Sequence, residues 1–169
     1  MAVFEAVPKA FGLPCLIMPA LRLPPQTFDP QRNQYYATAI LKKVLKHLPK
    51  NALKILAMTT VDLFIPIMKF IFGEAQFEGR AALFSTYRLR PEFYGFDPDR
   101  RLLLGRSTKE AVHELGHTFG LTHCFNPECV MHSSSLIQET DRKGAGLCPT
   151  CRELFEWTWA KKDNPVDYP

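Results

Sequence analysis

The sequence lacks any apolar stretch long enough to cross a bilayer. Its two best candidates are 11–23, which is interrupted by Pro14 and Pro19, and 61–72, which carries Asp62 and Lys69. Since a membrane-spanning helix needs about 20 consecutive apolar residues, neither segment qualifies. The start of the chain also lacks a recognisable targeting segment. These absences predict a cytoplasmic protein with no membrane partner.

Concentrated basic charge is missing as well. The net charge is +4, and the densest group of lysines is typical of a solvated helix face (Lys42, Lys43, Lys46 and Lys50). Because nucleic-acid binders usually carry a concentrated basic stripe, we expect no nucleic-acid partner. Repeats and low-complexity tracts are absent too. A chain of 169 residues that is 46% hydrophobic is then expected to form one compact domain, 1–169, and to act as a monomer.

One run of residues, 113–123, carries several side chains that can bind a metal ion or transfer a proton. His113 and His117 are spaced so that a helix places both imidazoles on one face, where they can bind a single metal ion. Glu114 lies about 100° further round such a helix, beside the metal and within reach of a water molecule. This is the position of a general base in a zinc hydrolase.

The residues after this pair complete the pattern. Gly120 tolerates a positive φ and can end the helix with a sharp turn, which lets His123 return as a third ligand. Three protein ligands leave a fourth position open, as in catalytic rather than structural zinc sites. A bare HExxH can arise by chance on a helix, but the added glycine and histidine make that interpretation a weak one.

Four of the five cysteines follow in two close pairs. They are Cys124 and Cys129, then Cys148 and Cys151. Four thiols with this spacing are typical of a structural zinc site, although two disulfides or four buried thiols are alternatives. Without a secretory signal, disulfides are disfavoured. The fifth cysteine, Cys15, is expected to be an ordinary buried thiol.

The histidine and cysteine motifs, with Met131 between them, resemble the archaemetzincins, a branch of the metzincin zinc peptidases. The resemblance covers roughly residues 50–155. It implies two zinc ions per chain. The catalytic zinc would be bound by His113, His117 and His123, with Glu114 as the general base and Met131 in the Met-turn. The structural zinc would be bound by Cys124, Cys129, Cys148 and Cys151.

Apolar periodicity and the resemblance together predict an α/β fold. Strands are expected at 13–18, 53–59, 69–76 and 81–87, and helices at 33–48, 108–119 and 153–162. Ser107 or Thr108 is a candidate N-cap for the site helix. We expect a metzincin-like, mixed, mostly parallel twisted sheet. The strand at 69–76 would be its antiparallel edge, and an irregular zinc-bound part would follow at about 121–169, after a sheet-and-helix part at about 1–120.

The expected activity is hydrolysis of peptide bonds, with zinc and Glu114 activating water. An extended peptide or protein substrate could add to the edge strand through main-chain hydrogen bonds. His132 and Tyr87 are candidates for stabilising the oxyanion, and each is equally well explained as a packing residue. Two other interpretations stay open: a catalytically silent, zinc-stabilised peptide-binding module, and a zinc-ribbon-like adaptor that uses the cysteines alone.

Overall fold

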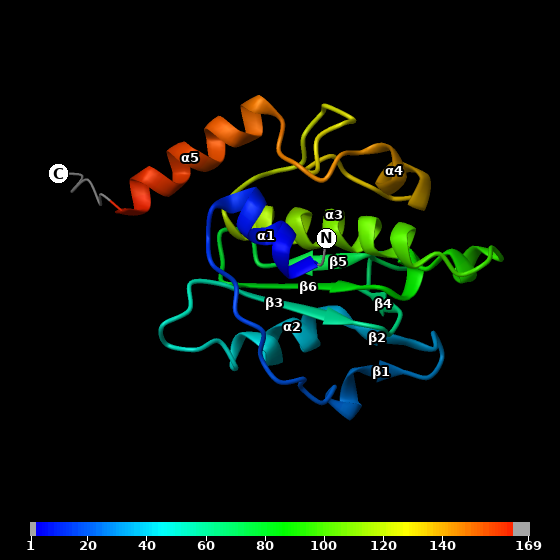
Figure 1. Ribbon diagram of the computed structural model, residues 1–169. Coiled ribbons are helices and arrows are strands. Elements are labelled where there is room, and N and C mark those ends of the chain that lie inside the picture. Colours follow the sequence, from blue (N-terminus) through cyan, green and yellow to red (C-terminus); the bar gives the residue numbers. More distant parts are fainter. Residues whose placement is uncertain (1–2, 164–169) are drawn as a thin grey trace.

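The computed structural model describes residues 3–163, which form a twisted β layer with helices on both of its faces (Figure 1). The site helix α3 (Arg100–Thr118) and α1 (Val3–Phe11) cover one face, and α2 (Ala37–Leu45) covers the other. The C-terminal helices α4 (Ile137–Arg142) and α5 (Pro149–Asp163) lie beyond α3, joined by long loops. The α/β architecture expected from the sequence is confirmed.

The strands form two small mixed sheets. One has the order β1 (Phe28–Asp29), β2 (Gln34–Tyr36), β4 (Leu63–Phe64), and the other has the order β3 (Ile55–Thr59), β6 (Ala81–Ser85), β5 (Gly73–Ala75). Each sheet has one antiparallel and one parallel pair, so parallel pairing does not predominate among the described residues. A single bridge between Leu63 and Ile71 joins β4 to the segment just before β5.

Strand β5 is the antiparallel outer strand expected within 69–76. It pairs with β6 in the register Gly73–Phe84, Glu74–Leu83 and Ala75–Ala82. β6 is buried at every position because helices cover both of its faces, which explains its continuous run of small and apolar residues. The other edge of β5 has no strand partner among the described residues. This open edge borders the cleft described below.

The site helix is longer than expected. It begins at Arg100, where the Asp99 side chain accepts a hydrogen bond from Leu102 N at 2.9 Å, so the predicted N-cap at Ser107 or Thr108 is wrong. The first two turns are largely exposed and include Gly105, so they carry little apolar periodicity. The helix ends as predicted, because Gly120 has φ +89° and donates its N–H to His117 O.

The N-terminal expectations are partly wrong. The predicted strand at 13–18 is irregular, and Leu16 and Ile17 are 87% and 77% exposed. Cys15 is exposed rather than buried. The predicted helix at 33–48 contains β2 followed by the shorter helix α2. An apolar run does not form a strand without a neighbouring strand edge to pair with.

The other elements agree more closely. The predicted strand at 53–59 contains β3, and the strand at 81–87 contains β6, after which the 3-10 turn Tyr87–Leu89 begins. The expected terminal helix at 153–162 lies within α5. Three buried clusters hold the layers together, and the largest joins α1, the end of α3, the Met131 region and α5. No described helix has the length and apolar character that a bilayer crossing needs.

Candidate active site

Three histidines converge at the C-terminal end of the site helix. The α-helical spacing places the ring nitrogens His113 Nε2 and His117 Nε2 3.1 Å apart, and His123 returns after the Gly120 turn. One donor nitrogen from each of the three lies within 4.8 Å of the other two. His113 is buried, His117 half-buried and His123 exposed, so the group opens toward solvent on one side.

The remaining ring nitrogens define what the group can bind. His113 Nδ1 donates to Val130 O at 2.8 Å, and His117 Nδ1 donates to Leu121 O at 2.7 Å, because a carbonyl oxygen can only accept. In the neutral rings both Nε2 atoms then carry lone pairs and face each other across 3.1 Å. Two facing lone pairs repel unless a cation lies between them. The donor set and its backbone supports therefore fit a zinc ion.

Burial keeps these imidazoles neutral. It lowers the pKa of His113 well below its ordinary value, and it lowers the pKa of His117 and His123 as well. Lys143, a nearby cation, acts in the same direction on all three. Metal binding needs deprotonated imidazoles, so low pKa values favour it.

Glu114 lies next to this group with its side chain against strand β5. It is only 6% exposed, and burial raises its pKa well above the ordinary value, with Glu110 adding to the effect. Among the described residues no hydrogen-bond donor engages its carboxylate. The carboxyl group therefore has no hydrogen bond to fix it, although the charge of Lys143 attracts it, and it lines the cleft together with the three histidines.

The cleft has a volume of about 500 Å³. Its walls are the segment before and within β5, one face of the site helix, and the loop after Met131. At its base the buried pair Lys143 and Glu110 approaches to 3.2 Å, and Lys143 also donates to His132 O at 3.4 Å. Sequence reasoning missed this pair, because the two residues are far apart in the chain and have no motif spacing.

Met131 lies beneath the histidines and is fully buried. A Cβ atom built on Gly116 would overlap with Met131 Sδ, so the glycine lets the methionine pack directly against the site helix. Neither His132 nor Tyr87 lines the cleft. His132 Nδ1 donates to Cys124 O at 2.8 Å, and the Tyr87 ring packs edge-on against Phe93. The packing interpretation is therefore the better one for both residues.

The four cysteines form a second group of possible ligands. Their Sγ atoms all lie within 4.8 Å of one another, although they come from two loops and the first turn of α5 (Cys124, Cys129, Cys148 and Cys151). None forms a disulfide, so that alternative is not what the structure shows. Burial raises the pKa of Cys129 and Cys151, whereas hydrogen bonding from the Cys151 backbone lowers that of Cys148. Four converging thiols of this kind fit a structural zinc ion.

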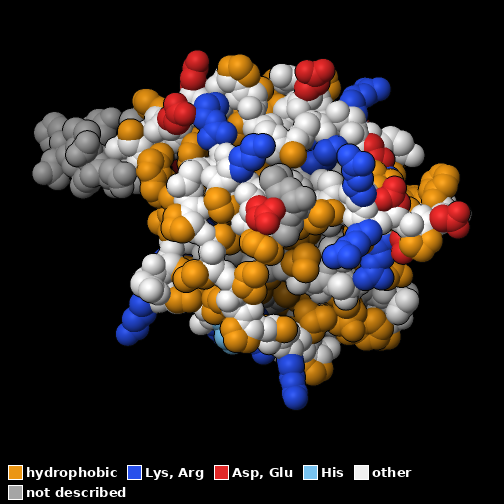
Figure 2. Space-filling view, viewed as in Figure 1, with side chains coloured by type: hydrophobic (Ala, Val, Ile, Leu, Met, Phe, Trp, Pro, Cys, Tyr) orange, Lys and Arg blue, Asp and Glu red, His pale blue; other side chains and the backbone are white. Residues whose placement is uncertain are grey.

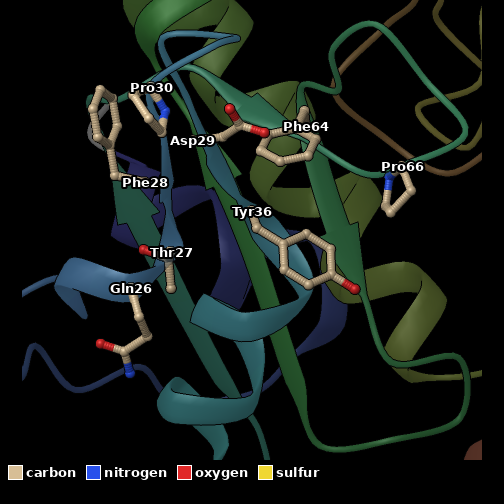
Figure 3. A pocket seen from close by; sticks show the side chains of 8 residues that line it. All are labelled: Gln26, Thr27, Phe28, Asp29, Pro30, Tyr36, Phe64 and Pro66. Atoms are coloured by element: carbon tan, nitrogen blue, oxygen red, sulfur yellow. The ribbon is translucent and has the colours of Figure 1, made fainter.

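A second hollow, of about 390 Å³, lies between β1, β2 and β4 (Figure 3). Phe28 and Pro30 face Tyr36, Phe64 and Pro66 across it. Its only carboxylate, Asp29, is engaged by the backbone N–H groups of the β1–β2 turn. It contains none of the metal-binding groups. On the molecular face seen in Figure 2, basic, acidic and apolar side chains are interspersed, with no basic stripe.

Comparison with known proteins agrees with this geometry. The model of peptidase family M54 matches residues 11–157. The archaemetzincin of Pyrococcus horikoshii is 47% identical over 136 residues, which cover 79% of this chain and 72% of that protein. The archaemetzincin of Methanocaldococcus jannaschii is 41% identical over 148 residues, covering 88% and 80%.

Solved structures show the same likeness. The crystal structure of archaemetzincin from Methanopyrus kandleri superposes with a TM-score of 0.84 at 37% identity, over 94% of this chain and 84% of that one. A zinc-dependent peptidase from Methanocorpusculum labreanum gives a TM-score of 0.81 at 35% identity, over 90% and 91%. Both the sequence matches and the fold show that the chain belongs to peptidase family M54, the archaemetzincins, and is a zinc metallopeptidase.

Proposed function

We propose that the catalytic zinc is bound by His113, His117 and His123, that Glu114 is the general base, and that the four cysteines bind a second, structural zinc. The observation that carries the proposal is the pair of Nε2 atoms 3.1 Å apart whose partner nitrogens both donate to carbonyl groups. Glu114 follows the first histidine directly and lines the same cleft. A bound zinc ion supplies a Lewis acid that acidifies water and polarises the scissile carbonyl.

Glu114 moves the proton in this reaction. Its carboxylate accepts a proton from the attacking water and then passes it to the leaving amine. Burial raises the pKa of Glu114, which favours its accepting a proton from the water. Lys143 and Glu110 keep the base of the cleft neutral as a pair. The substrate is an extended peptide that runs along the open edge of β5 through main-chain hydrogen bonds.

Elemental analysis of protein purified without chelator tests the metal assignment. We expect two zinc ions per chain, because three imidazoles and four thiolates cannot share one tetrahedral ion. Cys15→Ser is the matched control and should retain both ions, since this cysteine lies outside the two groups. A stable protein that binds a single zinc with all four grouped thiols free would contradict the structural site.

Replacing Glu114 with Gln tests the base. The variant keeps the size of the side chain, so zinc should remain bound while kcat for peptide hydrolysis falls at least about 10²-fold. Glu92→Gln, at an exposed position on the 3-10 turn Pro91–Tyr94, is the control and should leave kcat unchanged. Undiminished turnover in Glu114→Gln would show that another group activates the water.

A further inference from the structure

Gly73 is the point at which the outer strand β5 touches the general base. A Cβ atom built on Gly73 would lie 2.5 Å from Glu114 Oε1, 2.6 Å from Cγ and 2.7 Å from Cδ. Ordinary van der Waals contacts of a Cβ atom lie at 3.4–4 Å. The Glu114 side chain therefore occupies the space that any other residue at position 73 would fill with its first carbon.

The strand itself does not need a glycine here. Gly12, Gly95 and Gly120 adopt positive φ, but Gly73 does not, so its backbone conformation is open to any residue. A glycine inside a strand weakens it, because the unfolded chain loses more freedom and no side chain packs. The remaining explanation for Gly73 is the room that it leaves for Glu114.

The surroundings of Glu114 explain why the space left by Gly73 matters for the position of the carboxylate. Among the described residues no hydrogen-bond donor fixes its carboxylate, and the charge of Lys143 attracts it without fixing its direction, so steric contacts such as that with Gly73 determine where it lies. Strand alternation directs Glu74 to the opposite face, where Thr38 Oγ1 donates to Glu74 Oε1 at 2.7 Å. The backbone of β5 at Gly73 is thus the wall against which the Glu114 carboxylate rests.

A methyl group at this wall would move Glu114 rather than the strand. Gly73 is tied by strand pairing to Phe84 of the buried strand β6, whereas the atoms that a Cβ would meet, Cγ, Cδ and Oε1, belong to a side chain that can rotate. We propose that Gly73 is a positioning residue for the general base. This inference rests on the proposed role of Glu114. Its effect is exerted through the location of the carboxylate, because position 73 contributes no polar atom of its own side chain to the reaction.

Gly73→Ala is the direct test, with Gly105→Ala as the matched control. We expect Gly73→Ala to keep both zinc ions and a KM within about twofold of wild type, and to lower kcat by about 10²-fold, the cost of misplacing a reacting group by about 1 Å. Gly105 lies on the same site helix, has no atom within 4 Å of a built Cβ and has no positive φ. Gly105→Ala should leave kcat and KM unchanged.

The same substitution in a Glu114→Ala variant separates a positioning role of Gly73 from a general loss of stability. Glu114→Ala removes the atoms that a Cβ at 73 would meet, so adding Gly73→Ala should lower neither the residual kcat nor the melting temperature. An equal loss of kcat or melting temperature in both backgrounds would overturn the proposal. If Gly73→Ala alone folds poorly, recovery of the fold in the double variant supports the contact, and failure to recover overturns it.

Different results would contradict the positioning role of Gly73 and the proposed role of Glu114 as the general base. Wild-type kcat in Gly73→Ala, together with an inactive Glu114→Gln, would overturn the positioning role and leave Glu114 as the base. Full activity of Glu114→Gln would instead remove the proposed function on which the positioning role rests.

Discussion

The histidine group and the cysteine group are held in different ways. Two of the histidines lie on one continuous helix, and backbone carbonyls of Val130 and Leu121 fix their rings. The cysteines come from loops, and only Cys151 lies in a helix, in the first turn of α5. The histidine group is thus preorganised by regular secondary structure, whereas the loops of the cysteine group would gain most of their order from the proposed structural zinc.

Backbone contacts nevertheless join the two groups. Cys124, which directly follows the third histidine, donates its N–H to Met131 O at 2.9 Å, and its own carbonyl accepts from His132 at 2.8 Å. The loop that carries a thiol therefore also carries His123 and the Met131 segment beneath the histidines. From this difference we expect a substitution in the cysteine group to weaken metal binding at the histidine group more than a substitution in the histidine group weakens metal binding at the cysteines.

Removing a buried thiol should have the largest effect on stability. Cys151 belongs to the largest buried cluster, with Phe119 and Phe155, so Cys151→Ser would lose a proposed zinc ligand and put a polar group into that cluster. We expect a loss of more than about 4 kcal/mol, typical of losing a structural metal, and a melting temperature lower by more than about 10 °C. Thermal unfolding measures it, and the exposed Cys15→Ser is the control, expected within about 0.5 kcal/mol of wild type.

An intermediate effect tests the link between the groups. Cys124→Ser should weaken binding of the catalytic zinc by about 10–100-fold, because His123 loses its anchored neighbour. His123→Ala should leave the cysteine-bound zinc in place, since four thiolates hold their loops without the imidazole. A competitive chelator titration with a zinc-sensitive dye measures both. Wild-type affinity for catalytic zinc in Cys124→Ser would show that the two sites are independent.

The smallest expected effect is the pH dependence of the metal-free protein. Burial lowers the pKa of His113 and His117, so below about pH 6.5 the unfolded chain binds protons that the folded chain does not. The contribution of these two histidines to stability should therefore fall as the pH decreases through about 6.5, by roughly 1.4 kcal/mol for each unit of pKa shift, whereas the raised pKa of Glu114 acts in the opposite direction. Burial raises the pKa of Cys151, so its contribution is lost in the opposite direction, as the pH rises above the ordinary thiol value of 9.0.

Melting temperatures of chelator-treated protein at about pH 7.5 and about pH 5.5, on either side of the ordinary histidine pKa, measure this slope. His113→Gln should flatten it, and the comparison isolates the imidazole because Glu114 is present in both proteins. An unchanged slope in His113→Gln would mean that this histidine is not protonated on unfolding.

The sequence predicted that the three histidines and the four cysteines would each come together, because their spacing is local. His113 and His117 are one helical turn apart, and the cysteines form two close pairs, so spacing alone was informative. The contacts of Gly73 with Glu114 and of Lys143 with Glu110 join distant segments and leave no periodic signal. The same reasoning explains the failed strand at 13–18, since its apolar residues did not reveal whether a strand edge was available to pair with them.

The sequence also contains a signal for the true start of the site helix, at Asp99. Aspartate is a favoured N-cap residue, but the exposed turns that follow it and Gly105 interrupted the apolar pattern. In contrast, Gly120 was recognised because it lies within the motif, and its positive φ agrees with the predicted turn.

The burial of Met131 also protects the protein against oxidation. Converting its thioether to a sulfoxide would add a polar oxygen where Gly116 already leaves no spare room. Met18, Met58 and Met68, which are 42%, 61% and 43% exposed, would meet peroxide first. Because Met68 lines the cleft, mild oxidation would make the cleft wall more polar while the sulfur of Met131 stayed reduced.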